Sequence, residues 1–268
     1  MDYSSFHRFA PIIQNLSSSE LKGADSLFEK LLMKREGDLS ISYVPFEFIN
    51  KEARVVIVGI TPGKTQMVNA VAEVRRQLDS GCSAEGALQA AKLTGAFSGA
   101  MRPNLIALLD KIGMNQHLGL RTCEQLFGTR SLLAQTTSAL RNAVFLRNGN
   151  YNGTPNMVKT PVLKRELMSG FAVEARLLPE AVFVPLGGTV ADALAYLVSE
   201  GVIKRHQVLD GLPHPAGANA ERIAYFLGRK RRELLSVKTN PDKIDREKAL
   251  VIAQVSSLGS LVHGGVIQ

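Results

Sequence analysis

The chain has 268 residues, and its 32 lysines and arginines exceed its 24 aspartates and glutamates, giving a formal net charge of +8. Hydrophobic residues make up 45% of the chain, which predicts a buried core, and no apolar run reaches the ~18 residues that a membrane span needs. Two cysteines, Cys82 and Cys123, exclude a disulfide framework and a four-thiolate metal cluster within one chain. The basic excess favours a polyanionic partner, most often nucleic acid.

The first third of the chain shows one strand signal that stands out. Residues 1–18 are polar and serine-rich, without the pattern of a secretory signal, and are expected to form a loose leader. Apolar spacing predicts a helix over residues 20–34, and residues 41–48 have the composition of a strand. Residues 55–58 are a short apolar run that leads into a Gly-Ile-Thr-Pro-Gly loop, as at the end of a buried parallel strand.

The rest of the chain alternates between helical and strand patterns. Asn104 is expected to cap a helix over residues 105–112, and Thr189 a helix over residues 189–199. This alternation predicts an α/β fold with a central, mostly parallel sheet, and we expect a single domain over residues 1–268, with residues 236–268 as a C-terminal extension. Helices are predicted at residues 68–78, 84–92, 105–112, 163–177, 189–199, 219–235 and 248–258, and strands at 143–146, 182–186 and 207–209.

Three loops follow predicted strands. They are the 59–63 loop, an asparagine-rich loop over residues 147–153, and a Pro-His-Pro turn around His214. Ligands of parallel α/β sheets bind beyond the carboxyl ends of the strands. These loops are therefore the candidate site.

The Gly63-Lys64-Thr65 sequence suggests a phosphate-binding P-loop. Such a loop needs a glycine five residues before the second glycine, and that position is Val58. Pro62 also removes a backbone N–H from the segment that would hold phosphate. A P-loop nucleotide hydrolase is therefore the less favoured alternative.

His214 and Phe97 are two ring side chains in unusual sequence contexts. Prolines on both sides of His214 restrict the backbone and fix the direction of the imidazole, although a lone turn histidine more often bonds only to backbone. No second histidine lies near enough in sequence to suggest a metal site. Phe97 lies between Gly95 and Gly99, which favours a loop that presents the ring for stacking on a planar heterocycle.

Together these segments resemble the uracil-DNA glycosylase superfamily. The strand with the Gly59-Ile60-Thr61-Pro62-Gly63 loop is similar to its first motif, Gly-x-Asn-Pro-Gly. The His214-Pro215-Ala216-Gly217 sequence is similar to its second, His-Pro-Ser-Pro or His-Pro-Ser-Gly, and the Phe97 segment looks like its aromatic-bearing segment. The resemblance extends from about residue 55 to residue 228. It implies a three-layer α/β/α sandwich with a four-stranded, mostly parallel sheet.

The resemblance also implies a chemistry. A glycosylase flips the nucleotide out of the helix and hydrolyses its N-glycosidic bond, and donors that face the leaving base lower the barrier. His214 would be the catalytic donor, together with backbone N–H groups of the 59–63 loop. Phe97 would stack on the base. An amide would read the base edge, with Asn148 the first candidate and Asn150 and Asn142 the next.

Thr61 departs from the family pattern, which places Asp or Asn there to orient the attacking water. A hydroxyl can position water but is a poor base. We therefore expect either weak activity on uracil, help from another residue such as Gln66, or a bulkier substrate such as a modified pyrimidine. The last would indicate defence against phage DNA rather than base-excision repair. A sensor of the same fold that binds DNA without turnover is the alternative.

The basic residues after His214 suit single-stranded or duplex DNA as the partner. Arg222, Arg229 and Lys230 are expected to contact phosphates. Ala218 and Asn219 occupy the loop where relatives insert a wedge into the minor groove, but neither is a large apolar residue. No cofactor, metal, membrane or obligatory protein partner is expected, and the cytoplasm is the expected location.

Overall fold

The computed structural model describes residues 3–97, 99, 101–147 and 149–259. The chain divides into two compact units, each built from three separate stretches. The single domain expected over residues 1–268 stays a prediction. Unit 1 comprises residues 1–49, 59–98 and 136–177, and unit 2 comprises residues 50–58, 99–135 and 178–268.

A three-stranded parallel sheet has the order β4-β3-β7. In unit 2, β3 (Val55–Gly59) pairs with β7 (Val182–Pro185) from the Val55–Val182 pair to the Val58–Pro185 pair. Both strands are buried along their whole length, as their β-branched runs predict. The mixed α/β class is therefore confirmed.

The predicted strand at 207–209 is reduced to one parallel bridge between Val208 and Phe183. The remaining strand of the sheet is β4 (Ala134–Ser138), which the sequence did not indicate. The expected four-stranded parallel sheet is thus three strands with a single bridge beside β7.

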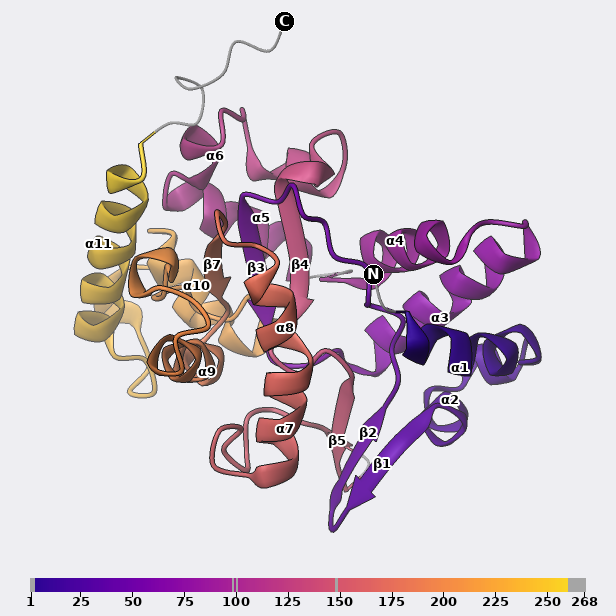
Figure 1. Ribbon diagram of the computed structural model, residues 1–268. Coiled ribbons are helices and arrows are strands. Elements are labelled where there is room, and N and C mark those ends of the chain that lie inside the picture. The colour runs from indigo at the N-terminus through magenta and orange to yellow at the C-terminus, as the bar shows by residue number, and fades with distance from the viewer. Residues whose placement is uncertain (1–2, 98, 100, 148, 260–268) are drawn as a thin grey trace, which may run out of the picture. The chain divides into compact units, whose positions relative to one another are not determined.

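Unit 1 contains a separate antiparallel sheet with the order β1-β2-β5-β6, of which Figure 1 labels β1, β2 and β5. Its strands are β1 (Leu32–Glu36), β2 (Leu39–Ser42), β5 (Ala143–Leu146) and β6 (Gly149–Asn150). The strand predicted at 143–146 is confirmed, but it pairs antiparallel with β2 and does not join β3. The helix predicted over 20–34 is wrong beyond Lys30, because the chain turns into β1.

The N-terminal segment is not the loose leader that its serines suggested. Residues 4–14 form helix α1 (Ser4–Gln14), which buries Phe6, Phe9 and Ile13. The Phe9 ring stacks on Tyr43 with 4.6 Å between centroids, and the Phe6 N–H donates to Glu47 Oε1. Aromatic burial therefore holds this helix in unit 1.

The other helices of unit 1 follow the predicted pattern with one exception. The helix predicted over 163–177 is divided at Gly170 into two helices. A Cβ on Gly170 would lie 2.9 Å from the Glu166 carbonyl oxygen. The helices are α2 (Ala24–Lys30), α3 (Lys64–Asp79), α4 (Ala84–Gly95), α7 (Pro161–Ser169) and α8 (Phe171–Arg176), with a 3-10 turn at Glu20–Lys22.

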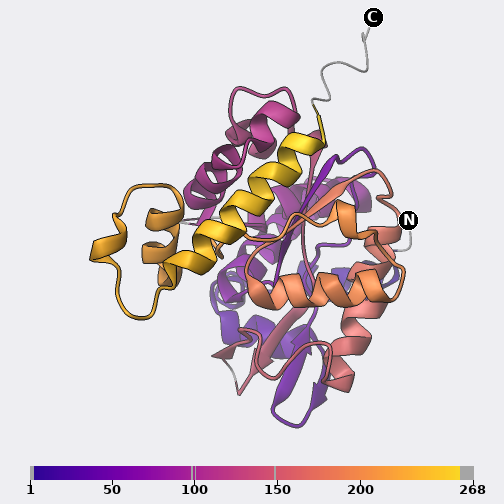
Figure 2. The ribbon, with the colours of Figure 1, turned by 90° about the vertical axis from the view of Figure 1, so that its left-hand side faces the viewer.

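Unit 2 packs helices around the β3–β7 pair. Figure 2 shows α11 in yellow and, between α10 and α11, a segment that loops away from both helices. The helices are α5 (Met101–Lys111), α6 (Met114–His117), α9 (Gly188–Ser199), α10 (Ala220–Phe226) and α11 (Pro241–Ser257), with 3-10 turns at Cys123–Phe127, Ser131–Leu133, Arg205–Gln207, Gly217–Asn219 and Arg232–Leu234.

Three predictions for unit 2 need correction. The helix expected over 219–235 ends at Phe226. Asn104 lies inside α5 and does not cap it, and the N-cap of α9 is Gly187 instead of Thr189. Within the described ranges, none of the helices has both the length and the apolar character that crossing a bilayer requires.

Candidate functional site

The 59–63 loop is fixed in unit 1 by the side chain of Thr61. Its hydroxyl donates to the Asn142 carbonyl oxygen at 2.8 Å and accepts from the Val144 N–H at 3.0 Å. Both contacts are to the backbone where β5 begins. The one hydroxyl proton is therefore already donated, and Thr61 can offer an attacking water only a remaining lone pair.

Phe97 packs against Gly59. The backbone of Phe97 has φ +49°, which is rare for a side chain of this size, and the residue is only 5% exposed. A Cβ at position 59 would lie 3.3 Å from the Cε1 and Cζ atoms of the ring. Phe97 therefore lies outside the helices, as predicted, but its ring is buried instead of displayed at the surface.

Asn150 and Gly63 meet at the start of α3. Asn150 Oδ1 accepts from the Lys64 N–H at 3.2 Å, and its Nδ2 lies 3.5 Å from where a Cβ on Gly63 would be. The Gly63 N–H donates to Gln66 Oε1 at 3.1 Å. Among the described residues, the amide N–H groups of Asn150 therefore have no partner. The first candidate for reading a base, Asn148, lies outside the described residues.

These contacts disfavour the P-loop interpretation. A P-loop binds phosphate through backbone N–H groups, but those of Gly63 and Lys64 are already bonded to side-chain oxygens. The Lys64 ammonium pairs with Asp25 at 2.6 Å. Ile60, predicted in the same loop, is half-buried, and its carbonyl oxygen accepts from the Leu140 N–H.

His214 is held in unit 2 close to the end of β7. Gly187, which follows this strand after one residue, has φ +88°, and a Cβ there would lie 3.3 Å from the Cβ of His214. Asn104 Nδ2 donates to the Pro215 carbonyl oxygen at 3.0 Å and ties the loop to α5. The glycine therefore lets the histidine loop approach the strand end closely.

The hydrogen bond of the His214 ring determines its tautomer. Nδ1 lies 3.2 Å from the Ala216 nitrogen and accepts its N–H. Burial lowers the pKa of His214, so the ring is neutral at pH 7. A neutral imidazole with an accepting Nδ1 carries its proton on Nε2. Nε2–H is therefore a defined donor.

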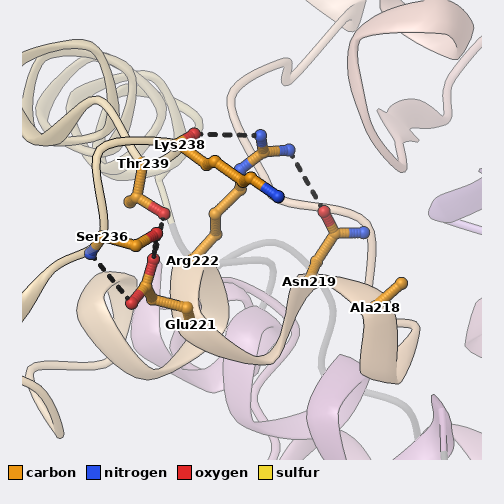
Figure 3. A pocket seen from close by; sticks show the side chains of 7 residues that line it. All are labelled: Ala218, Asn219, Glu221, Arg222, Ser236, Lys238 and Thr239. Atoms are coloured by element: carbon orange, nitrogen blue, oxygen red, sulfur yellow. Dashed lines mark hydrogen bonds between the residues drawn. The ribbon is translucent and has the colours of Figure 1, made fainter.

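Three of the five predicted DNA-binding residues line one pocket of about 370 Å³ in unit 2 (Figure 3). They are Ala218, Asn219 and Arg222. Arg229 is exposed outside this pocket lining. Lys230 pairs with Glu221 at 2.7 Å, so its charge is already matched.

Metal ligands do not gather anywhere in the described part of the chain: no three histidine, cysteine, aspartate or glutamate side chains there lie close enough to hold an ion.

Comparison with known proteins finds a relative in Bacillus subtilis strain 168, the uncharacterized protein YoxB. The two sequences are 34% identical over 226 residues, which cover 83% of this chain and 88% of YoxB. This chain belongs to the YoxB family. No family model matches the chain, and no solved structure matches it. Since the similarity covers most of both chains, the YoxB relationship concerns the fold as a whole and not one motif.

Sequence reasoning missed two residues that this YoxB-family structure places beside predicted ones. Ser138 ends β4, and its Oγ lies 3.5 Å from where a Cβ on Gly59 would be. Its position at the end of a strand could have indicated Ser138. That strand was not recognised because residues 134–138 include Gln, Thr and Ser. Lys238 lines the pocket with Arg222, within a segment interpreted only as an extension.

Proposed function

We propose that this chain is a monofunctional DNA glycosylase. It flips a uracil or modified pyrimidine out of DNA and hydrolyses the N-glycosidic bond, which leaves an abasic site. The observation that carries the proposal is the neutral His214 ring, whose Nδ1 accepts from Ala216 and whose Nε2–H is therefore a fixed donor. A glycosylase needs such a group at the leaving base.

The sheet supports the finer fold that the resemblance implies. Besides the Val208–Phe183 bridge, the Leu209 N–H donates to the Phe183 carbonyl oxygen at 2.9 Å. A chain segment thus runs parallel to β7 on the side away from β3. We propose that it is the fourth strand of a four-stranded, mostly parallel sheet within an α/β/α sandwich.

The residues act in the proposed reaction as follows. Bond cleavage leaves positive charge on the sugar and negative charge on the base. His214 Nε2–H donates to the base as this negative charge develops, and a donor in this role contributes about 3–4 kcal/mol. The resemblance assigns base stacking to Phe97 and the reading of the base edge to an asparagine such as Asn150, but Phe97 is buried, so the proposal rests on His214. Water then gives its hydroxyl group to the sugar carbon, and its proton passes to the released base, which completes the hydrolysis.

The bonds of Thr61 favour a slow enzyme or one with an unusual substrate. Because the hydroxyl is bonded to Asn142 and Val144, it gives the attacking water little orientation. A modified pyrimidine that leaves more readily than uracil needs less help from water. This favours a role in defence against phage DNA over repair. Since both cysteines are free thiols and the substrate is DNA, we also propose a cytoplasmic location.

The bonded Thr61 hydroxyl also favours a second candidate, a sensor of the same fold that binds a base without turnover. One experiment separates the two. Genomic DNAs with different base modifications, and duplexes with uracil, are incubated with the full chain, and released bases are identified by mass spectrometry. A free base and a matching abasic site support the glycosylase. Specific binding without release supports the sensor.

The control for this experiment compares two histidines. His214→Ala removes the proposed donor, and His206→Ala removes an exposed histidine of the same unit. Base release that persists unchanged in His214→Ala would refute the mechanism.

A further inference from the structure

A tight turn projects next to the pocket of Figure 3. The Thr239 N–H donates to the Ser236 carbonyl oxygen at 3.0 Å, which closes a turn over residues 236–239. We call it the 236–239 turn. Its central residues are Val237 and Lys238, both exposed. Val237 has a relative exposure of 104%, so its apolar side chain is entirely in solvent.

Glu221 anchors both ends of the 236–239 turn. Its carboxylate accepts from the Ser236 N–H at 3.1 Å, from the Ser236 hydroxyl at 2.6 Å and from the Thr239 hydroxyl (Figure 3). Hydrogen bonds from Lys230, Ser236 and Thr239 hold the pKa of Glu221 far below its usual value. The anchor therefore stays ionised, and the exposure of Val237 is imposed by the structure.

The pocket beside this turn carries positive charge. Arg222 donates to Asn219 Oδ1 at 3.2 Å and to the Lys238 carbonyl oxygen at 3.4 Å, and both acceptors are neutral. Lys238 contributes a second cation to the pocket lining. The carboxylate in the lining, Glu221, is paired with Lys230. An anion that enters the pocket therefore meets two cations.

We propose that this pocket holds a backbone phosphate of DNA between Arg222 and Lys238, with Val237 packed on the neighbouring deoxyribose. The choice of DNA rests on the proposed function. A free anion would use the two cations but has no surface for Val237, whereas a nucleic-acid strand places an apolar sugar beside each phosphate. The turn thus supplies the apolar contact that Ala218 and Asn219 are too small or too polar to provide.

The first test measures the salt dependence of DNA binding. Binding of a fluorescent duplex is followed by anisotropy for Arg222→Gln, Lys238→Gln and the double variant, with exposed Lys204→Gln as the matched control. We expect each pocket variant to weaken binding about threefold to tenfold. Loss of one phosphate contact lowers the slope of log K against log[salt] by about 0.9. Because both cations hold one phosphate, the double variant should lose about 0.9 and not twice that.

The second test separates DNA from free phosphate. Val237→Ser should weaken DNA binding about threefold without changing the salt slope, while Leu250→Ser, a matched exposed apolar residue on α11, should not. Inorganic phosphate at equal ionic strength should not displace the DNA. If it does, and Val237→Ser has no effect, the site is one for free phosphate and the inference is wrong.

The third test concerns the anchor. Glu221→Gln should weaken DNA binding because an amide has one accepting oxygen where the carboxylate uses both, so the turn loses part of its anchor. Exposed Glu233→Gln removes the same charge and should leave binding unchanged. All binding is measured in the His214→Ala background, so that turnover does not contribute. Pocket variants that bind like Lys204→Gln overturn the inference alone. Intact binding without base release by the unmodified chain overturns the glycosylase alone.

Discussion

The 59–63 loop and the His214 loop both offer a polar side chain for catalysis, yet the two side chains differ in their hydrogen bonds to the backbone. In unit 1 the Thr61 hydroxyl donates to one backbone group and accepts from another. In unit 2 His214 accepts a single backbone N–H at Nδ1. A hydroxyl has one proton and loses it to such bonding, whereas an imidazole bonded at one nitrogen has a defined second nitrogen. The comparison suggests that Thr61 stabilises structure and His214 performs chemistry.

The largest expected effect tests the catalytic role of His214. His214→Ala should lower the rate of base release about 10²- to 10³-fold, the cost of removing one preorganised donor. Its free energy of unfolding should change little compared with that effect. Single-turnover kinetics and urea denaturation measure the two quantities. A fall in rate that merely follows a loss of folded protein would contradict the assignment.

If Thr61 stabilises the structure, replacing it should lower the free energy of unfolding more than the rate of base release. Thr61→Val leaves the Asn142 carbonyl and the Val144 N–H without this partner, and should lower the free energy of unfolding by about 1–3 kcal/mol. Thr61→Ser keeps the hydroxyl and should lose less. Exposed Thr65→Val is the control. If Thr61→Val abolishes base release in fully folded protein, Thr61 is catalytic and the comparison fails.

A smaller effect is expected when the bond that fixes the imidazole is removed. Ala216 has φ −66°, which proline adopts without strain, and Ala216→Pro deletes the N–H that Nδ1 accepts. One such bond contributes about 1 kcal/mol, so base release should slow about fivefold. The pH profile should also change, because Nδ1 is then free to take a proton. An unaltered rate and profile would show that the bond does not position the ring.

The smallest effect is a pH dependence of stability. Burial lowers the pKa of His214, so the unfolded chain binds a proton at this residue more readily than the folded chain does. The stability that results is complete above the ordinary value of 6.5 and declines as pH falls below it. The melting temperature of the unmodified chain should therefore decrease more than that of His214→Gln between pH 7.5 and 5. Parallel curves would contradict a lowered pKa, and His206→Gln reports on an exposed histidine.

The buried strands and most helices could be predicted from the sequence, because their apolar spacing is unambiguous. Residues 55–58 and 182–185 are apolar runs, which indicated β3 and β7 directly. β4 was missed because its polar residues hide it, and β5 was placed in the wrong sheet because a short apolar run does not specify its partner. α1 was missed because its buried residues lie in a polar, proline-containing segment.

The candidate site was predictable in residue identity but not in bonding. Motif spacing indicated Thr61 and His214, but only the structure shows which of their atoms the backbone already uses. Phe97 was expected to be displayed, since its glycine neighbours suggested a loop. The close approach of its ring to Gly59 depends on a tertiary contact that the local sequence does not encode. The same holds for Lys238, whose turn is held at the pocket because Glu221 binds Ser236, fifteen residues further along the chain.

The order in which β3 and β7 are synthesised has a consequence for folding in the cell. Val55 pairs with Val182, so β3, which also neighbours β4 in the sheet, leaves the ribosome long before β7 exists. The last stretch of unit 1 ends at residue 177, whereas unit 2 needs residues 178–268. Unit 1 can therefore be complete while the edge of β3 that later pairs with β7 is still open, and open apolar strand edges are prone to aggregate. Newly made chains should need a chaperone until β7 emerges, and a chain truncated after residue 177 should be insoluble.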